Sequence, residues 1–153
     1  MNTKTFRLLL SNSILVWFLS LAANNAAYAD GKNIVGAWLI ESTYPEFEIT
    51  ETAVQIYNKD KTLSVTGEGG GTCYGIWRKA GNNNYEEKIV CIIEPGNPNG
   101  FPVGTIVTFL DTLTLDKKTD TVTGSGTVTW TLGEAVLFQT TATYVQKRIT
   151  FDE

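Results

Sequence analysis

The sequence predicts an all-β fold, an eight-stranded antiparallel up-and-down barrel. No window keeps apolar residues at the helical spacing i, i+3, i+4, i+7, whereas short runs rich in β-branched and aromatic residues alternate with turn signals. The links between these runs are short, which favours antiparallel neighbours because a parallel crossover needs about a dozen residues. Closing the sheet into a barrel removes exposed edges. A two-sheet β-sandwich is the alternative.

The first 29 residues have the features of a secretory signal peptide. Lys4 and Arg7 form a positive n-region, an apolar stretch follows over residues 8–23, and Ala27-Tyr28-Ala29 provides a cleavage site. The alternative is a membrane anchor, but the unbroken part of the stretch is shorter than the ~20 residues that a spanning helix needs. We therefore expect export, periplasmic or secreted, after cleavage near Ala29, and a single mature domain over residues 30–153.

Charge and composition of the mature part exclude several classes of function. Two of the chain's 12 basic residues fall in the signal, which leaves 10 against 16 acidic residues. Nucleic-acid binding is disfavoured, because it needs clustered Lys and Arg. The chain has no histidine, which excludes imidazole catalysis and the usual zinc sites. No later segment is apolar enough to span a membrane as a helix, and we expect no cofactor.

The first three strands are expected over residues 34–44, 48–57 and 61–66. The turn residues Asn58-Lys59-Asp60 separate the second from the third. The first turn, around Pro45, is acidic, but Ca²⁺ needs six or more oxygens in a defined loop and no D-x-D-x-D-G pattern occurs. We interpret it as a solvated turn without a metal. Its acidic residues are Glu41, Glu46, Glu48 and Glu51.

The next two strands, 72–79 and 85–93, form a hairpin that contains both cysteines. If the hairpin is centred on Asn82, Cys73 lies directly opposite Cys91, where side chains are close enough to be bridged. An even number of cysteines in an exported chain also favours a disulfide. Two buried free thiols are the alternative, and a redox-active pair is less well supported because no C-x-x-C occurs.

The last three strands are expected over residues 103–115, 120–132 and 136–149. The segment 121–132 shows the clearest pattern, with Val, Gly, Trp and Leu at even positions and Thr or Ser at odd ones. This period of two predicts one buried face and one face in water.

Two loops differ from the other connections. Residues 67–71 are glycine-rich, but the Gly-Lys-Ser/Thr and the helix of a phosphate loop are missing, so we expect a flexible loop. Residues 94–102 hold three of the four prolines and the apolar Phe101, a composition that fits either a lid or a plain surface excursion. In a strict meander this loop is an odd-numbered connection, so we expect it at the rim opposite Trp38.

Gly36-Ala37-Trp38 in the first strand resembles the G-x-W element of lipocalins and related calycin-type barrels. In that family the Trp packs at the closed end of the barrel, and an Arg near the end of the last strand covers its ring. Arg148 is the matching candidate here. The resemblance thus implies structural roles for Gly36, Trp38 and Arg148, with a cation–π contact of ~0.5–2 kcal/mol.

A second resemblance covers more of the mature chain. Gly75-Ile76-Trp77-Arg78, Pro102-Val103-Gly104 and Thr123-Gly124-Ser125-Gly126 are similar to segments of small exported bacterial proteins with a lipocalin-like or allene-oxide-cyclase-like barrel. The lipocalin T-D-Y motif is not visible, and no residues map onto a cyclase active site. The resemblance therefore implies fold and export, and leaves the activity open.

Candidate site residues follow from the parity of the late strands. Asp111 shares its face with apolar residues, so an inward position would make it a carboxyl with a raised pKa, a possible general acid. We prefer the simpler interpretation that it lies at a wet end, because buried unpaired acids are rare. Filling the core is the default role for the aromatic residues in small barrels, and lining a ligand cavity is the alternative. The candidates for ligand contact are Phe101, Phe109, Trp130, Phe138 and Tyr144.

Three functions remain open: an exported barrel that binds a small apolar molecule, a cyclase or isomerase, and a filled barrel that acts as an interaction or inhibitor module. A cavity above ~300 Å³ would favour the first two over the third. A carboxyl with a perturbed pKa beside that cavity would favour the enzyme.

Overall fold

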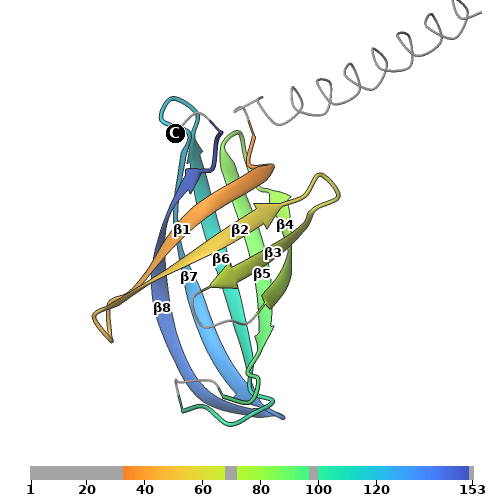
Figure 1. Ribbon diagram of the computed structural model, residues 1–153, viewed down its shortest axis with the longest axis vertical. Helices are drawn as coiled ribbons and strands as arrows, with labels where there is room; N and C mark the ends of the chain where they lie inside the picture. Colours follow the sequence, from red (N-terminus) through yellow and green to blue (C-terminus); the bar gives the residue numbers. More distant parts are fainter. Residues whose placement is uncertain (1–32, 68–71, 97–99, 152–153) are drawn as a thin grey trace, which may run out of the picture. The chain divides into compact units, whose positions relative to one another are not determined.

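The computed structural model describes residues 33–67, 72–96 and 100–151, which form a closed barrel of eight antiparallel strands in sequence order (Figure 1). Each strand pairs with the next, and β8 (Ala135–Arg148) pairs with β1 (Gly36–Tyr44) to close the sheet. The predicted fold class and the up-and-down barrel are confirmed, and the sandwich is excluded. The described residues contain no helix, and therefore none long and apolar enough to cross a bilayer.

The strand boundaries lie within three residues of those predicted. The remaining strands are β2 (Ile49–Tyr57), β3 (Thr62–Gly67), β4 (Thr72–Lys79), β5 (Asn84–Ile92), β6 (Ile106–Asp116) and β7 (Thr121–Leu132). The expected alternation holds in β7, where Val122 and Val128 are buried. Period-two patterning therefore determines which side chains face the interior.

Trp38 and Arg148 lie together at one end of the barrel. The Trp38 ring is fully buried, its Nε1 donates a hydrogen bond to the Ile34 carbonyl at 2.8 Å, and the Arg148 guanidinium lies 4.2 Å from the ring centroid. Arg148 also donates to the Val35 carbonyl at 2.8 Å and pairs with Asp120 at 2.6 Å. These contacts join the residues before β1 to the end of β8 around the Trp38 ring, so this end of the barrel is closed.

Gly36 is required by the same arrangement. Its φ of 135° is a conformation that other residues rarely adopt, and a Cβ here would lie 2.7 Å from Arg148 Nη1. The glycine of the G-x-W element therefore leaves space for the guanidinium. Beyond Trp38, the interior is filled by Trp77, which packs edge-on against Tyr57 and Tyr85.

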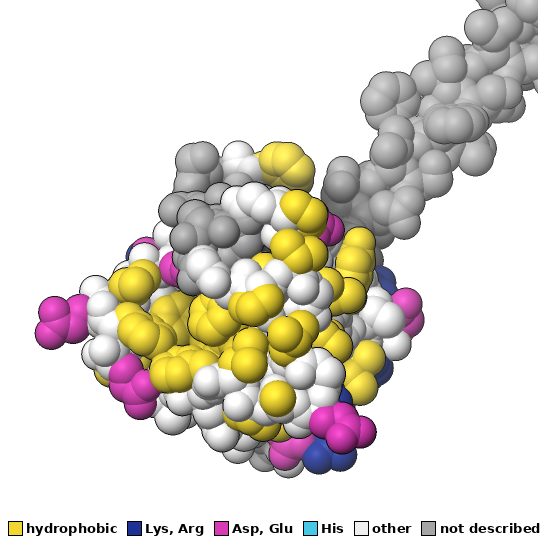
Figure 2. Space-filling view, turned by 90° about the horizontal axis from the view of Figure 1, so that it is seen from below, with side chains coloured by type: hydrophobic (Ala, Val, Ile, Leu, Met, Phe, Trp, Pro, Cys, Tyr) yellow, Lys and Arg dark blue, Asp and Glu magenta, His cyan; other side chains and the backbone are white. Residues whose placement is uncertain are grey.

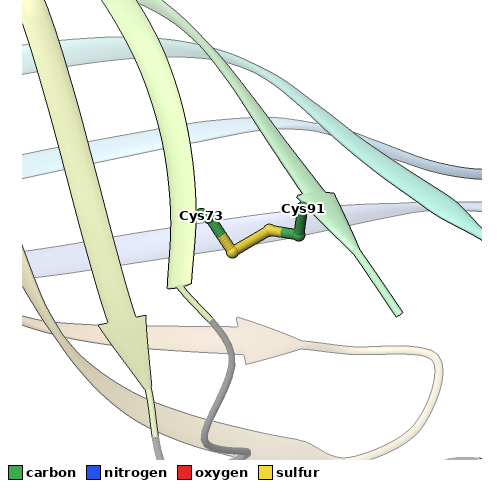
Figure 3. Close-up of a disulfide and its surroundings, with 2 residues drawn as sticks. All are labelled: Cys73 and Cys91. Atoms are coloured by element: carbon green, nitrogen blue, oxygen red, sulfur yellow. A yellow bond between two sulfur atoms is a disulfide. The ribbon is translucent and has the colours of Figure 1, made fainter. Parts of the chain in front are cut away.

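Cys73 on β4 and Cys91 on β5 form a disulfide, with Cα atoms 4.4 Å apart (Figure 3). The neighbouring pair Tyr74 and Val90 has the register of a hairpin centred on Asn82. Both the predicted pairing and the predicted register are confirmed, and the alternative of two free thiols is excluded.

Some predictions fall outside the described residues. These are the signal peptide with its cleavage site at Ala29, the glycine-rich loop from residue 68 to 71, and residues 97–99 of the proline-rich loop.

Candidate functional site

A cavity of about 660 Å³ occupies the half of the barrel opposite Trp38. Figure 2 looks onto this end, where apolar side chains line a hollow and acidic side chains stand around its margin. The described ends of the proline-rich loop contribute Glu94, Pro95 and Phe101 to the lining, as does Phe47 between β1 and β2. These are odd-numbered connections of the meander, so the cavity opens at the end expected for this loop.

Four aromatic rings form a continuous row at the mouth, which we call the aromatic rim: Phe47, Phe101, Trp130 and Phe138. Phe101 stacks on Trp130, with ring centroids 5.5 Å apart and planes inclined by 16°. Phe138 lies 5.4 Å from Trp130 and 5.3 Å from Phe47 between centroids. The rings come from four separate segments, and they offer large apolar faces to a molecule that enters the cavity.

Two carboxyls, which we call the carboxyl pair, lie deeper in the cavity. Glu87 on β5 stands directly opposite Asp111 on β6, and each residue is only 5% exposed. Gln55 Nε2 and the Tyr57 hydroxyl each donate a hydrogen bond of 2.8 Å to Glu87 Oε2. Gln146 Nε2 donates in turn to the Tyr57 hydroxyl at 3.2 Å. A polar layer thus separates the filled half of the barrel from the hollow half.

Asp111 lies on the inward parity of β6, and its neighbour on β7 leaves room for the carboxyl because it has no side chain. Gly126 is its register partner, and a Cβ at that position would clash with Asp111 Oδ1 and with the Leu110 carbonyl. The glycine leaves the space that the carboxyl occupies. The preferred interpretation of Asp111 as a residue at a wet end is therefore wrong, since the side chain is buried and lines the cavity.

Burial changes the protonation of this pair. It raises the pKa of Asp111 to about 7 from an ordinary value of 3.8. Burial and then the charge of Asp111 raise the pKa of Glu87 to about 8 from 4.5. Carboxyls this close titrate as a pair, because the first charge disfavours the second. Near neutral pH the pair therefore retains a proton and can donate, accept or transfer it.

The structure places most of the other predicted ligand-contact residues at the cavity. Phe101, Phe109, Trp130 and Tyr144 line it. Phe138 is absent from the lining among the described residues and instead supports Trp130 in the aromatic rim.

Sequence reasoning missed Glu87 and Gln55. Glu87 lies between Tyr85 and Ile89 on the inward parity of β5, so a charged residue on an apolar face was the available signal. Its partner could not be identified, because the irregular loop after β5 leaves the register with β6 undetermined by sequence. Of the acidic first turn, Glu51 lines the cavity, and no group of three metal-ligating side chains gathers among the residues that the structure describes.

Comparison of the chain with protein-family models, with curated proteins and with solved structures found no match.

Proposed function

We propose that this chain is an exported, lipocalin-like barrel that binds a small apolar molecule in its open half. The observation that carries the proposal is the cavity of about 660 Å³. Small-molecule sites typically measure ~300–1,000 Å³ and combine apolar walls with a few polar groups. Here the aromatic rim supplies the apolar contact, and the carboxyl pair supplies the polar group.

Two further features support export and the lipocalin resemblance. The Cys73–Cys91 disulfide fits an oxidising compartment. The contact of Arg148 with the Trp38 ring has the arrangement that the resemblance implies.

Native mass spectrometry of the exported protein tests the binding function directly, because a molecule held in the cavity adds its mass to the chain. A fluorescence titration with retinoid-like, aromatic and alkyl probes gives a second reading, since Trp130 lines the cavity whereas Trp38 and Trp77 are buried toward the closed end. We expect probe-dependent emission changes that Trp130→Phe abolishes. If no bound mass is found and no probe changes the Trp130 emission, the binding function is rejected.

A cyclase or isomerase, similar to allene oxide cyclase, is the second candidate, favoured by the carboxyl pair inside the cavity. With a pKa of about 7, Asp111 could exchange a proton with a substrate near neutral pH. Asp111→Asn should then retain the unconverted substrate, whereas the unmodified protein converts it to an isomer of the same mass, which chromatography distinguishes from the substrate. If the unmodified protein and Asp111→Asn retain the same molecule and neither changes it on incubation, the enzyme candidate is rejected and the binding function remains.

The third candidate, a filled barrel acting as an interaction or inhibitor module, loses its premise because the open half is hollow.

A further inference from the structure

The deep end of the cavity presents buried hydrogen-bond acceptors without partners. Asp111 Oδ1, Asp111 Oδ2 and Gln55 Oε1 have no partner in good hydrogen-bond geometry among the described residues, and neither has the Tyr144 hydroxyl, although Tyr144 and Glu87 lie close enough to Asp111 to shift its pKa. All three residues are at least nine-tenths buried and line the cavity. A buried polar atom left unpaired is destabilising, because the free energy of its desolvation is not compensated. A ligand that brings donors to this point would recover that free energy.

The acidic residues that line the cavity determine which charge the ligand's head group can carry. Glu51, Glu87, Glu94 and Asp111 line the cavity, whereas no Lys or Arg does so among the described residues. In a partly dehydrated cavity these carboxyls repel an anionic head group and attract a cation. A fatty acid, whose carboxylate would have to lie beside Asp111, is therefore a poor fit.

The number of donors narrows the chemistry further. A primary ammonium carries three N–H donors and no acceptor, which matches the acceptor oxygens of Asp111, Glu87 and Gln55. A hydroxyl brings one donor, and a trimethylammonium brings none. We propose that the ligand is an amphipathic primary amine whose ammonium lies between Glu87 and Asp111 and whose apolar part extends to the aromatic rim. The inference rests on the proposed binding function and names its ligand class.

The register of the strands gives the path of the apolar part. Ile89 pairs with Phe109 at the next inward-facing position toward the mouth from the carboxyl pair. Val107 pairs with Trp130 at the inward-facing position after that. From Asp111 to Val107 is four residues of strand, or about 13 Å. An alkyl or arylalkyl amine would cross this distance against apolar walls and finish at the aromatic rim.

Binding of the amine should displace a proton. The ammonium replaces the proton that the carboxyl pair retains, both carboxyls become charged, and the displaced proton passes to solvent. The titratable groups that face the pair from β1, β2 and β8 are Tyr44, Tyr57 and Tyr144, and burial raises the pKa of each. These three tyrosines stay neutral near pH 7. Amine affinity should therefore rise with pH as the pair loses its proton.

Four probes with the same tail test the head group: decylamine, decanol, decanoate and decyltrimethylammonium, each added to the mature, disulfide-bonded protein and followed by Trp130 emission and calorimetry. We expect decylamine to bind at least ~10-fold more tightly than decanol, with the other two weaker. Equal or tighter binding of decanol or decanoate would overturn the amine assignment and leave the binding function standing. No binding of any probe would overturn the binding function itself.

Calorimetry of the unmodified protein with decylamine in two buffers of different ionisation enthalpy measures the proton directly. We expect release of about one proton per amine near pH 7, and none for decanol. Release of no proton by decylamine would contradict its placement between the carboxyls.

Variants then locate the head group. Asp111→Asn should weaken decylamine at least ~10-fold and weaken decanol much less, because the amine loses the carboxylate charge whereas the hydroxyl still finds the amide oxygen as an acceptor. Glu87→Gln, the second variant, should behave likewise. Glu86→Gln is the matched control, since Glu86 precedes Glu87 on β5 but faces solvent and pairs with Arg78. An amine affinity that is unaffected by Asp111→Asn and Glu87→Gln would reject the site.

Discussion

Gly126 shows how one missing side chain positions a carboxyl. We expect Gly126→Ala to destabilise the barrel by about 1–3 kcal/mol, because its Cβ would clash with Asp111 Oδ1 and with the backbone carbonyl of Leu110. Denaturant unfolding measures the change. Ser125→Ala on the outward face of the same strand is the control and should cost less than ~0.5 kcal/mol. Equal stability of the two variants would show that the space beside Asp111 is not limiting.

Trp38 joins the first and last described strands at the closed end. We expect Trp38→Ala to cost about 3–5 kcal/mol, because the ring is fully buried and also carries the Arg148 contact. Thermal or denaturant unfolding gives the value. Leu39→Ala, at an exposed position of the same strand, should have little effect. A Trp38→Ala protein with unchanged stability would show that the ring does not hold this end together.

The β4–β5 hairpin is the element that the disulfide stabilises. We expect the double substitution of Cys73 and Cys91 by serine to lower the free energy of unfolding by about 3 kcal/mol, because the bridge restricts a loop of 18 residues in the unfolded chain. Denaturant unfolding of oxidised and substituted proteins measures the difference. Thiol titration of the unfolded, unreduced protein should find no free thiol, and two thiols per chain would contradict the bridge.

The loop between β5 and β6 places Phe101 on Trp130 at the mouth. We expect Phe101→Ala to change the association rate of apolar probes, because the stacked ring must shift for a molecule to pass. Stopped-flow measurement of Trp130 emission follows the rate. Val103→Ala, an exposed change in the same loop, is the control and should leave the rate unaltered. Identical rates in all three proteins would show that Phe101 does not gate entry.

At the scale of strands and hairpins, the sequence predicts the strands better than it predicts the candidate site. Alternation over residues 121–132 and the turn centred on Asn82 determine which residues face inward and which cysteines meet. Glu87 and Asp111 meet across a pairing whose register depends on the irregular connection after β5, so local pattern does not reveal it. The interior position of Asp111 further depends on Gly126, a contact between different strands that spacing in the sequence does not encode.

At the scale of the whole molecule, the barrel divides into a filled half and a hollow half. Trp38, Trp77 and Tyr85 pack the closed half, and the carboxyl pair marks the boundary. The closed half supplies apolar burial, while the open half leaves buried acids without full compensation. Such sites trade stability for function.

The carboxyl pair should make the stability of the barrel depend on pH. Both groups have a raised pKa when folded, so the folded state holds more protons than the unfolded chain between about pH 4 and about pH 8. The free energy of unfolding should therefore fall as pH rises across this range. Denaturant unfolding at several pH values measures the slope.

Asp111→Asn combined with Glu87→Gln should flatten that dependence, because neither side chain then titrates. Glu86→Gln should leave it unchanged, since this half-exposed carboxyl pairs with Arg78 and does not line the cavity. A slope that persists in the double variant would assign the effect to other groups.

Every strand in the barrel wall is hydrogen-bonded to both of its neighbours. The pairing of β1 with β8 closes the wall, and the disulfide links β4 to β5. A ligand therefore has one path into and out of the cavity, along the barrel axis past Trp130. A molecule whose polar end reaches the carboxyl pair enters head first and leaves tail first. The apolar end of such a molecule would lie at the aromatic rim and would be the first part to leave the cavity.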